Sequence, residues 1–152
     1  MLSPLQVQNR WFGEIRLEPC DGLSEAERNE RSITCRHSIT ARHWENDSST
    51  WMVKLRVELV HPDAGPKSLY LGSVEAFGEF EIHPECPDED RLKYACASGG
   101  AVLYASIKEL ICSITARSLH GMIELPTLDA RCFLPKKNAT VSSHIEGSAE
   151  QK

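Results

Sequence analysis

The stretch GGAVLYASIKELICSITARSLHGMIELPTLD, residues 99–129, decides the fold, because its helical part is apolar around most of its circumference. One face carries large apolar residues at helical spacing, namely Leu103, Ile107, Leu110 and Ile114. Further apolar or small residues widen that face: Tyr104, Ile111, Ala101, Ala105, Cys112 and Ala116. A helix that lies on a sheet needs one apolar stripe, so this helix has surplus apolar surface. Either another element of the chain or a second copy covers the surplus, and the polar composition of the remaining sequence favours a second copy.

The composition is that of a single globular domain. The chain has 152 residues, of which 41% are hydrophobic and 26% are charged. We expect the domain to span residues 1–135 and the polar residues 136–152 to form a disordered tail. The net charge of −5 argues against nucleic acid as a partner, since phosphate binding requires a basic face. The first residues lack the pattern of a signal peptide and no apolar run has the length of a spanning helix, which favours a cytoplasmic protein without membrane insertion.

Four segments before the helix show the alternation of β-strands. They are residues 11–18, 33–42, 51–60 and 69–82. The clearest is WMVKLRVELV, residues 51–60, in which apolar and charged residues alternate. In the first segment Trp11, Ile15 and Leu17 share the apolar side, and in the fourth the apolar parity shifts near Gly72, which predicts a β-bulge there. Strands joined by polar turns predict a four-stranded antiparallel sheet with one wet face.

The periodicity changes after the fourth strand. The acids of PECPDED, residues 84–90, precede an apolar run, as is typical of the start of a helix. We expect a long helix from about Asp88 to about Ser118, bent near Gly99-Gly100. A sheet followed by a helix that packs on it defines the α+β class.

No arrangement of residues indicates catalysis. The sequence lacks a P-loop, a GxSxG turn, an HExxH helix and a dinucleotide fingerprint, so we expect neither an enzyme nor a cofactor. His83, Cys86 and Cys96 have zinc-ligand chemistry, but their spacing provides no paired knuckle and no fourth ligand. Cys112 and His120 are read as a small helix residue and a loop histidine. We expect no bound metal, and reduced structural thiols for the six cysteines.

The order of these elements, over roughly residues 8–134, resembles the bacterial protein-export chaperone SecB family. In that family the long helix has an apolar-aromatic start, a basic-acidic pair and an Ile-polar-Ser run, and a loop of L-x-L-x-P type follows. VLYASIKELICSITARSLHGMIELPTLDA keeps this order through Leu103, Lys108, Glu109, Ile111, Ser113, Arg117, Ile123 and Leu125. Two strands match as well, through Leu55, Arg56 and Val57 in the third and Val74, Gly78 and Phe80 in the fourth.

The resemblance implies a fold and a function. The fold is a four-stranded antiparallel sheet with the long helix and a short C-terminal helix packed on one face. The subunits assemble as a homotetramer, a dimer of dimers. The function is an ATP-independent holdase that binds unfolded or precursor polypeptides in apolar grooves and delivers them to the SecA motor, which contacts the acidic wet face of the sheet.

Three sets of residues are predicted to carry these roles. The apolar breadth of the helix places the subunit interface at Leu103, Ile107, Leu110, Ile111 and Ile114. Apolar positions in loops and short elements are candidates for peptide binding: Leu23, Met122, Ile123, Leu128, Phe133 and Leu134. The resemblance gives the motor-docking residues Glu14, Glu18 and Leu71.

The sequence also departs from the family. Ser73 replaces an expected acid, and Ala105 and Ser106 replace a Pro-Tyr pair of the long helix. The loop CDGLSEAERNE is polar where the family is aromatic, and Pro135 shortens the final helix. These differences indicate a divergent SecB-like protein. They leave a second hypothesis open, a SecB-like adaptor or chaperone dedicated to one partner such as an antitoxin.

Overall fold

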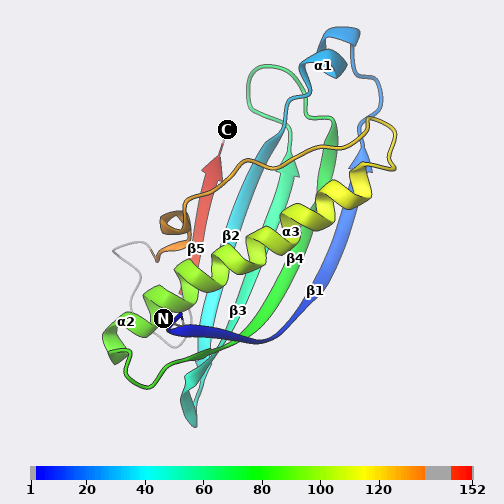
Figure 1. Ribbon diagram of the computed structural model, residues 1–152. Coiled ribbons are helices and arrows are strands. Elements are labelled where there is room, and N and C mark those ends of the chain that lie inside the picture. Colours follow the sequence, from blue (N-terminus) through cyan, green and yellow to red (C-terminus); the bar gives the residue numbers. More distant parts are fainter. Residues whose placement is uncertain (1–2, 136–144, 152) are drawn as a thin grey trace.

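An antiparallel sheet carries the long helix on one of its faces, and the short helix α1 lies in the connection beyond the strand ends (Figure 1). The computed structural model describes residues 3–135 and 145–151. The elements are β1 (Leu5–Pro19), α1 (Glu25–Glu30), β2 (Thr34–Trp44), β3 (Asp47–Val60), β4 (Tyr70–Ile82), α2 (Asp88–Tyr94), the π-helical turn η1 (Ala95–Gly99), α3 (Gly100–Thr115), the 3₁₀ turn η2 (Ala130–Phe133) and β5 (Ile145–Gln151). The strand order is β1-β4-β3-β2-β5, and every pair is antiparallel. The predicted α+β class and the antiparallel sheet of four strands, β1 to β4, are confirmed, with η2 as the short C-terminal helix and β5 as an added fifth strand.

The core lies between the sheet and α3. The apolar residues of β3 alternate as the sequence predicts, and its inward side chains Val53, Leu55 and Val57 are fully buried. From β4, Val74 and Phe80 face the same core. Alternation with one buried face fixes the register of these strands, because a slip by one residue would turn every apolar side chain to the wet face.

β1 differs from the alternation predicted for residues 11–18. Its register with β4 shifts between Val7 and Asn9 and again between Phe12 and Ile15. Because of the second shift, Trp11 pairs with Phe77 and stacks on its ring, with the ring centroids 5.7 Å apart. The prediction that Trp11 shares a side with Ile15 and Leu17 is therefore wrong, since an extra residue in a strand reverses the facing of all residues on one side of it.

The bulge predicted near Gly72 lies in the partner strand instead. Gly72 pairs in register with Leu17 of β1 and Leu59 of β3. Gly72 has φ 147°, and a Cβ there would collide with the backbone carbonyl oxygen of Arg16. The change of apolar parity in the sequence thus marks a close approach of two strands, for which glycine is required.

The long helix continues through the predicted bend. α2, η1 and α3 follow one another without a break, and the irregularity near Gly99-Gly100 is the π-helical turn η1. A single π turn inserts one residue into a helix and changes the direction of its side chains. Gly100 allows close packing, because a Cβ there would lie 2.7 Å from Cγ of Phe133 and 2.8 Å from Cδ1 of Ile39.

The surplus apolar surface of the helix is covered in part by the chain itself. Leu103, Ile107 and Ile111 face the sheet and are fully buried. After α3 the chain turns back and runs extended over the same face of the sheet toward β2 and β5 (Figure 1). Ile123 and Leu125 of this segment are buried in the same core. The expectation that a second copy covers the helix therefore applies to a narrower strip than the sequence suggested.

The polar tail expected at residues 136–152 contains a strand. Ile145–Gln151 form β5, which pairs with β2, with Cys35 opposite Gln151 and Ala41 opposite Ile145. An edge strand presents unpaired backbone N–H and C=O groups, and even a polar segment can pair with them. Residues 136–144 lie outside the described residues.

In the part of the chain that the structure describes, one helical stretch, Asp88–Thr115, is long and apolar enough to cross a membrane by length and composition alone. It lies along the sheet, and its inward side chains belong to the core of the domain. A core helix passes the same test of length and composition, and its packing here is that of a core helix.

Candidate functional site

The predicted peptide-binding residues fall into two groups. Leu23, Ile123 and Phe133 are buried inside the subunit. Met122 is 56% exposed, Leu134 is 37% exposed and Leu128 is partly buried against the core. Met122, Leu134 and Leu128 therefore offer free apolar surface. The three buried residues are part of the core of the domain.

Residues 121–134, which we call the C-terminal segment, link these residues. Its start is held by side chains that bind main-chain atoms. The Arg31 guanidinium donates to the carbonyl oxygens of His120 at 3.0 Å and Met122 at 2.7 Å. The Tyr70 hydroxyl accepts from the His120 N–H at 3.0 Å and donates to the Gly121 carbonyl at 2.9 Å.

Arg31 holds this position at a conformational cost. It ends α1 with φ 53°, the left-handed region that side chains other than glycine rarely adopt. Ser24 and Glu27 form a capping box at the other end of α1 and fix the short helix. The polar loop between β1 and β2 thus supplies a guanidinium that holds the C-terminal segment.

The next residues of the segment are tied to α3. The Thr115 hydroxyl accepts from the Ile123 N–H at 3.0 Å, and the Cys112 thiol donates to the Ile123 carbonyl at 3.2 Å. Lys108 forms an ion pair with Glu124 at 3.2 Å. Ile123 and Leu125 are buried between these contacts. This proximal part, residues 121–125, is a fixed part of the domain.

In the distal part, residues 126–134, main-chain carbonyls accept hydrogen bonds from side chains of α3 and β2. The Tyr104 hydroxyl donates to the Pro126 carbonyl at 2.7 Å, and Nε2 of His37 lies 3.3 Å from the Cys132 carbonyl. Burial lowers the pKa of His37, so the neutral ring donates its N–H to this carbonyl. Phe133 is the buried anchor of this part, with ring centroids 5.1 Å from His37 and 5.9 Å from Tyr104.

The predicted interface residues are also divided. Leu103, Ile107 and Ile111 are covered by the sheet of their own subunit, so they are not available to a second copy. Leu110 and Ile114 remain partly exposed on the side of α3 that faces β1. A groove of about 300 Å³ lies there, which we call the β1–α3 groove, lined by Arg10, Trp11, Phe12, Ala76, Leu103, Ser106, Glu109, Leu110 and Ser113.

β1 forms an exposed edge beside this groove. Its free side has no strand partner in the described sheet, and it carries Val7, Trp11, Phe12 and Ile15, each 38–46% exposed. Exposed apolar side chains along a long edge strand are unusual in a monomer, because such an edge promotes pairing with another chain.

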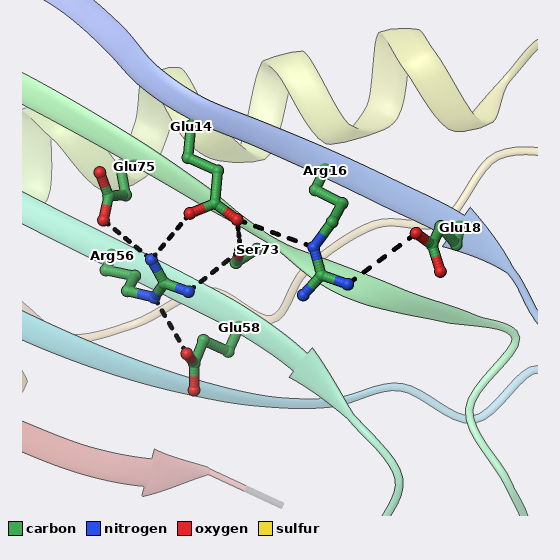
Figure 2. A network of polar contacts seen from close by, with 7 residues as sticks. All are labelled: Glu14, Arg16, Glu18, Arg56, Glu58, Ser73 and Glu75. Carbon is green, nitrogen blue, oxygen red and sulfur yellow. Dashed lines mark hydrogen bonds and ion pairs between the residues drawn. The ribbon is translucent and has the colours of Figure 1, made fainter.

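The wet face of the sheet carries the predicted motor-docking residues, and β1 and β4 bring them together. Glu18 of β1 pairs directly with Leu71 of β4, and Glu14 lies on the same face beside Ser73. Figure 2 shows that these acids belong to a network with cations of the chain itself. The sequence places Arg16 and Arg56 at outward positions of their strands but does not show that they pair with these acids.

Arg56 is the centre of the network. Its guanidinium lies 3.1 Å from Glu14, 2.8 Å from Glu75 and 2.9 Å from Glu58 (Figure 2). A hydrogen bond from Ser73 at 2.7 Å and those from Arg56 lower the pKa of Glu14. Burial acts to raise the pKa of Glu75, but hydrogen bonds from Arg56 and Lys54 outweigh it, so this pKa is also lowered. Glu14 and Glu75 are therefore ionised and paired.

The outer rim of the network is looser. Arg16 lies 3.7 Å from Glu14 and 3.9 Å from Glu18 (Figure 2). Four carboxylates, Glu14, Glu18, Glu58 and Glu75, thus share Arg16, Lys54 and Arg56. The face is close to electrically neutral, and a basic partner would have to compete with these internal pairs.

The buried cysteines have the character of structural thiols. Cys35 and Cys96 are buried, and burial raises the pKa of both, that of Cys96 to about 12. Thiols with raised pKa values are poor nucleophiles and poor metal ligands. Within residues 3–135 and 145–151, no three or more His, Cys, Asp and Glu side chains are grouped to hold a metal ion.

Comparison with family models and with curated proteins gives no match for the sequence. Among solved structures, the chain is similar to a SecB-like chaperone of Mycobacterium tuberculosis in complex with a peptide from the HigA1 antitoxin. The TM-score is 0.58 at 16% identity, over 82% of this chain and 91% of that chain. A protein of unknown function from Streptococcus agalactiae has a TM-score of 0.47 at 10% identity, over 81% of this chain and 97% of that chain. The chain therefore has a divergent SecB-like fold, as the sequence resemblance implied.

Proposed function

We propose that this protein is a cytoplasmic, ATP-independent chaperone that holds unfolded or precursor polypeptides. The observation that carries the proposal is the fold, which is similar over most of both chains to a chaperone solved with a bound peptide. Exposed apolar side chains around the C-terminal segment, Met122, Leu119 and Leu134, support it. Such side chains bind many unfolded chains, since burial of apolar area requires little sequence specificity.

The test is suppression of aggregation. Wild-type protein at near-stoichiometric ratio should reduce the light scattering of a chemically denatured client enzyme without added nucleotide. Met122→Ser combined with Leu119→Ser should weaken this effect and leave the melting temperature unchanged. Trp44→Ser is the control, because Trp44 is 51% exposed, similar to Met122 at 56%, but lies at the distant β2–β3 turn. Failure of the wild type against several unrelated clients would refute general holding.

The same proposal includes assembly, as a homotetramer. The exposed edge of β1 and the partly exposed Leu110 and Ile114 are the surface that a second copy would cover. Light scattering coupled to gel filtration should give about 68 kDa, four times the subunit mass of 17.0 kDa. Ile15→Asp should reduce this mass without unfolding, because an unpaired charge buried in an interface costs several kcal/mol. A monomer at micromolar concentration would contradict assembly.

A second candidate is a chaperone dedicated to one partner, such as an antitoxin. Two observations favour it over delivery to SecA. The similar chaperone was solved with an antitoxin peptide, and the acids Glu14 and Glu18 are paired with Arg56 and Arg16. Titration of labelled protein with purified SecA distinguishes the two: saturable binding that is lost in Glu18→Lys would favour delivery to the motor. Binding of one antitoxin peptide together with no suppression of general aggregation would favour the dedicated partner.

A further inference from the structure

The two parts of the C-terminal segment are held by different means. Side chains that hydrogen-bond the backbone of the proximal part come from Arg31, Tyr70, Cys112 and Thr115. The distal part, residues 126–134, is held to other elements by hydrogen bonds from Tyr104 and His37 and by the buried ring of Phe133. Its Asp129–Arg131 ion pair is local and ties it to nothing else. Leu128 packs partly buried against the core, and Phe133 is the large apolar side chain of the distal part that is fully buried.

Phe133 occupies a defined slot between β2 and α3. His37 meets its ring edge to face, and Tyr104 packs at a tilt. The slot exists because residue 100 is glycine: a Cβ there would lie 2.7 Å from Cγ of Phe133 and 2.8 Å from Cδ1 of Ile39. The floor of the slot therefore belongs to the rigid part of the domain, and the ring that fills it belongs to the final residues before Pro135.

The hydrogen bonds around the slot are made to main-chain atoms. Tyr104 and His37 bind the carbonyl oxygens of Pro126 and Cys132, respectively. A carbonyl is present in every residue, so any extended chain that places an aromatic ring in the slot can offer the same acceptors. Aromatic anchors in buried pockets, flanked by contacts to the main chain, are a common mode of peptide recognition.

We propose that the distal part is an internal substitute for client, and that an extended polypeptide displaces it and places an aromatic side chain in the Phe133 slot. This inference rests on the proposed chaperone function and adds the site and its regulation. In the free protein the slot is filled, which keeps its apolar walls from water and from other copies. A client binds after the distal part leaves, so the apparent affinity is reduced by the small fraction of molecules with an open slot.

Two substitutions with opposite effects test the proposal. The probe is fluorescently labelled, reduced and carboxymethylated α-lactalbumin, which is permanently unfolded. Phe133→Ala removes the competing ring and should tighten probe binding roughly tenfold, because the open fraction rises. Gly100→Ala fills the slot for the internal ring and the client alike and should weaken binding at least as much. Ile82→Ala is the matched control, since it removes buried apolar volume far from the slot and should leave the affinity unchanged.

A synthetic peptide tests directly whether the slot can exchange its occupant. PTLDARSFLP, residues 126–135 with Cys132→Ser, should bind the Phe133→Ala protein and compete with the probe. The same peptide with alanine in place of the phenylalanine should not. This arm does not depend on client binding, so a protein that binds the peptide but no unfolded probe would refute the chaperone function and leave the exchangeable slot standing.

Hydrogen exchange of the wild type tests the proposal even if the variants fail to fold. Saturating probe should increase the exchange of amides in residues 127–134 and leave residues 121–125 protected. Unchanged or increased protection of residues 127–134 would overturn the proposal, as would weaker probe binding in Phe133→Ala. Equal tightening in Ile82→Ala would overturn it too, because general loosening of the domain would then explain the gain.

Discussion

The two faces of the sheet are built from the same strands but are stabilised by different interactions. The face under α3 is dry, and its inward residues such as Val53, Val74 and Phe80 are almost fully buried. The opposite face is wet and carries acids and bases that pair with one another around Arg56 (Figure 2). Packing holds the first face, and electrostatics hold the second. Burial of apolar area contributes far more free energy than exposed ion pairs, so the two faces should respond very differently to substitution.

The largest expected effect is on the dry face. Ile107→Asp places a charge between α3 and the sheet, where Ile107 is fully buried, and should prevent folding. Circular dichroism and gel filtration would show an unfolded or aggregated chain. Ala105→Asp is the control on the exposed side of the same helix and should fold. A folded Ile107→Asp protein that is merely dissociated would show that Ile107 lies at a subunit interface after all.

The next effect is on the pairing of β1 with β4. Gly72→Ala forces a Cβ against the Arg16 carbonyl and places a non-glycine residue at φ 147°. We expect a loss of about 2–3 kcal/mol in the free energy of unfolding, measured by urea denaturation. Gly65→Ala separates the two causes, because Gly65 also has a positive φ, 97°, but no neighbouring atom within 4 Å. Equal losses in both variants would show that the close approach of β1 is unimportant.

A smaller effect is expected on the wet face. Arg56→Met leaves Glu75, which is mostly buried, with Lys54 at 3.2 Å as its remaining cation. The free energy of unfolding should fall by about 1–2 kcal/mol, since a partly buried acid loses a charged hydrogen bond. Arg42→Met, on the exposed part of β2, should change it by less than about 0.5 kcal/mol. The Arg56→Met protein should also bind a basic partner more tightly, because the acids are then no longer paired with the Arg56 guanidinium.

The smallest effect is a pH dependence of stability. The pKa of Glu75 lies below its ordinary value of 4.5, so its contribution is complete above that pH and is lost as the pH falls through the lowered pKa. The melting temperature of the wild type should therefore drop between about pH 5 and pH 3. The decline should be shallower in Arg56→Met, because the main cause of the lowered pKa is gone. Parallel profiles in the two proteins would show that Arg56 does not control these acids.

Most of the fold could be predicted from the sequence, because alternation and helical periodicity are local patterns. The strand at residues 51–60 and the helix stripe through Leu103 and Ile107 follow from spacing alone. The side of Trp11 could not be predicted, because the register shift between Phe12 and Ile15 depends on how β1 meets β4. A shift of this kind adds one residue on one strand and leaves composition and hydropathy unchanged.

The candidate site was harder to predict, because apolar character does not distinguish a groove from a core. Apolar character alone predicted Ile123 and Phe133 as peptide-binding residues, whereas packing in the folded subunit buries both side chains. Arg31 and Tyr70 gave no signal, since their partners are main-chain atoms some 50 to 91 residues away in the sequence.

The sequence by itself determined that this chain is an α+β domain with a one-sided sheet, an unusually apolar helix and a set of acids on the wet strands. The tertiary structure decided which apolar surface is left over and whether those acids are free. Both outcomes depend on contacts between residues far apart in the chain: the C-terminal segment covers part of α3, and Arg56 of β3 neutralises Glu14 of β1. A pattern along the chain shows what each residue can do, and the partner that folding places beside it fixes what it does.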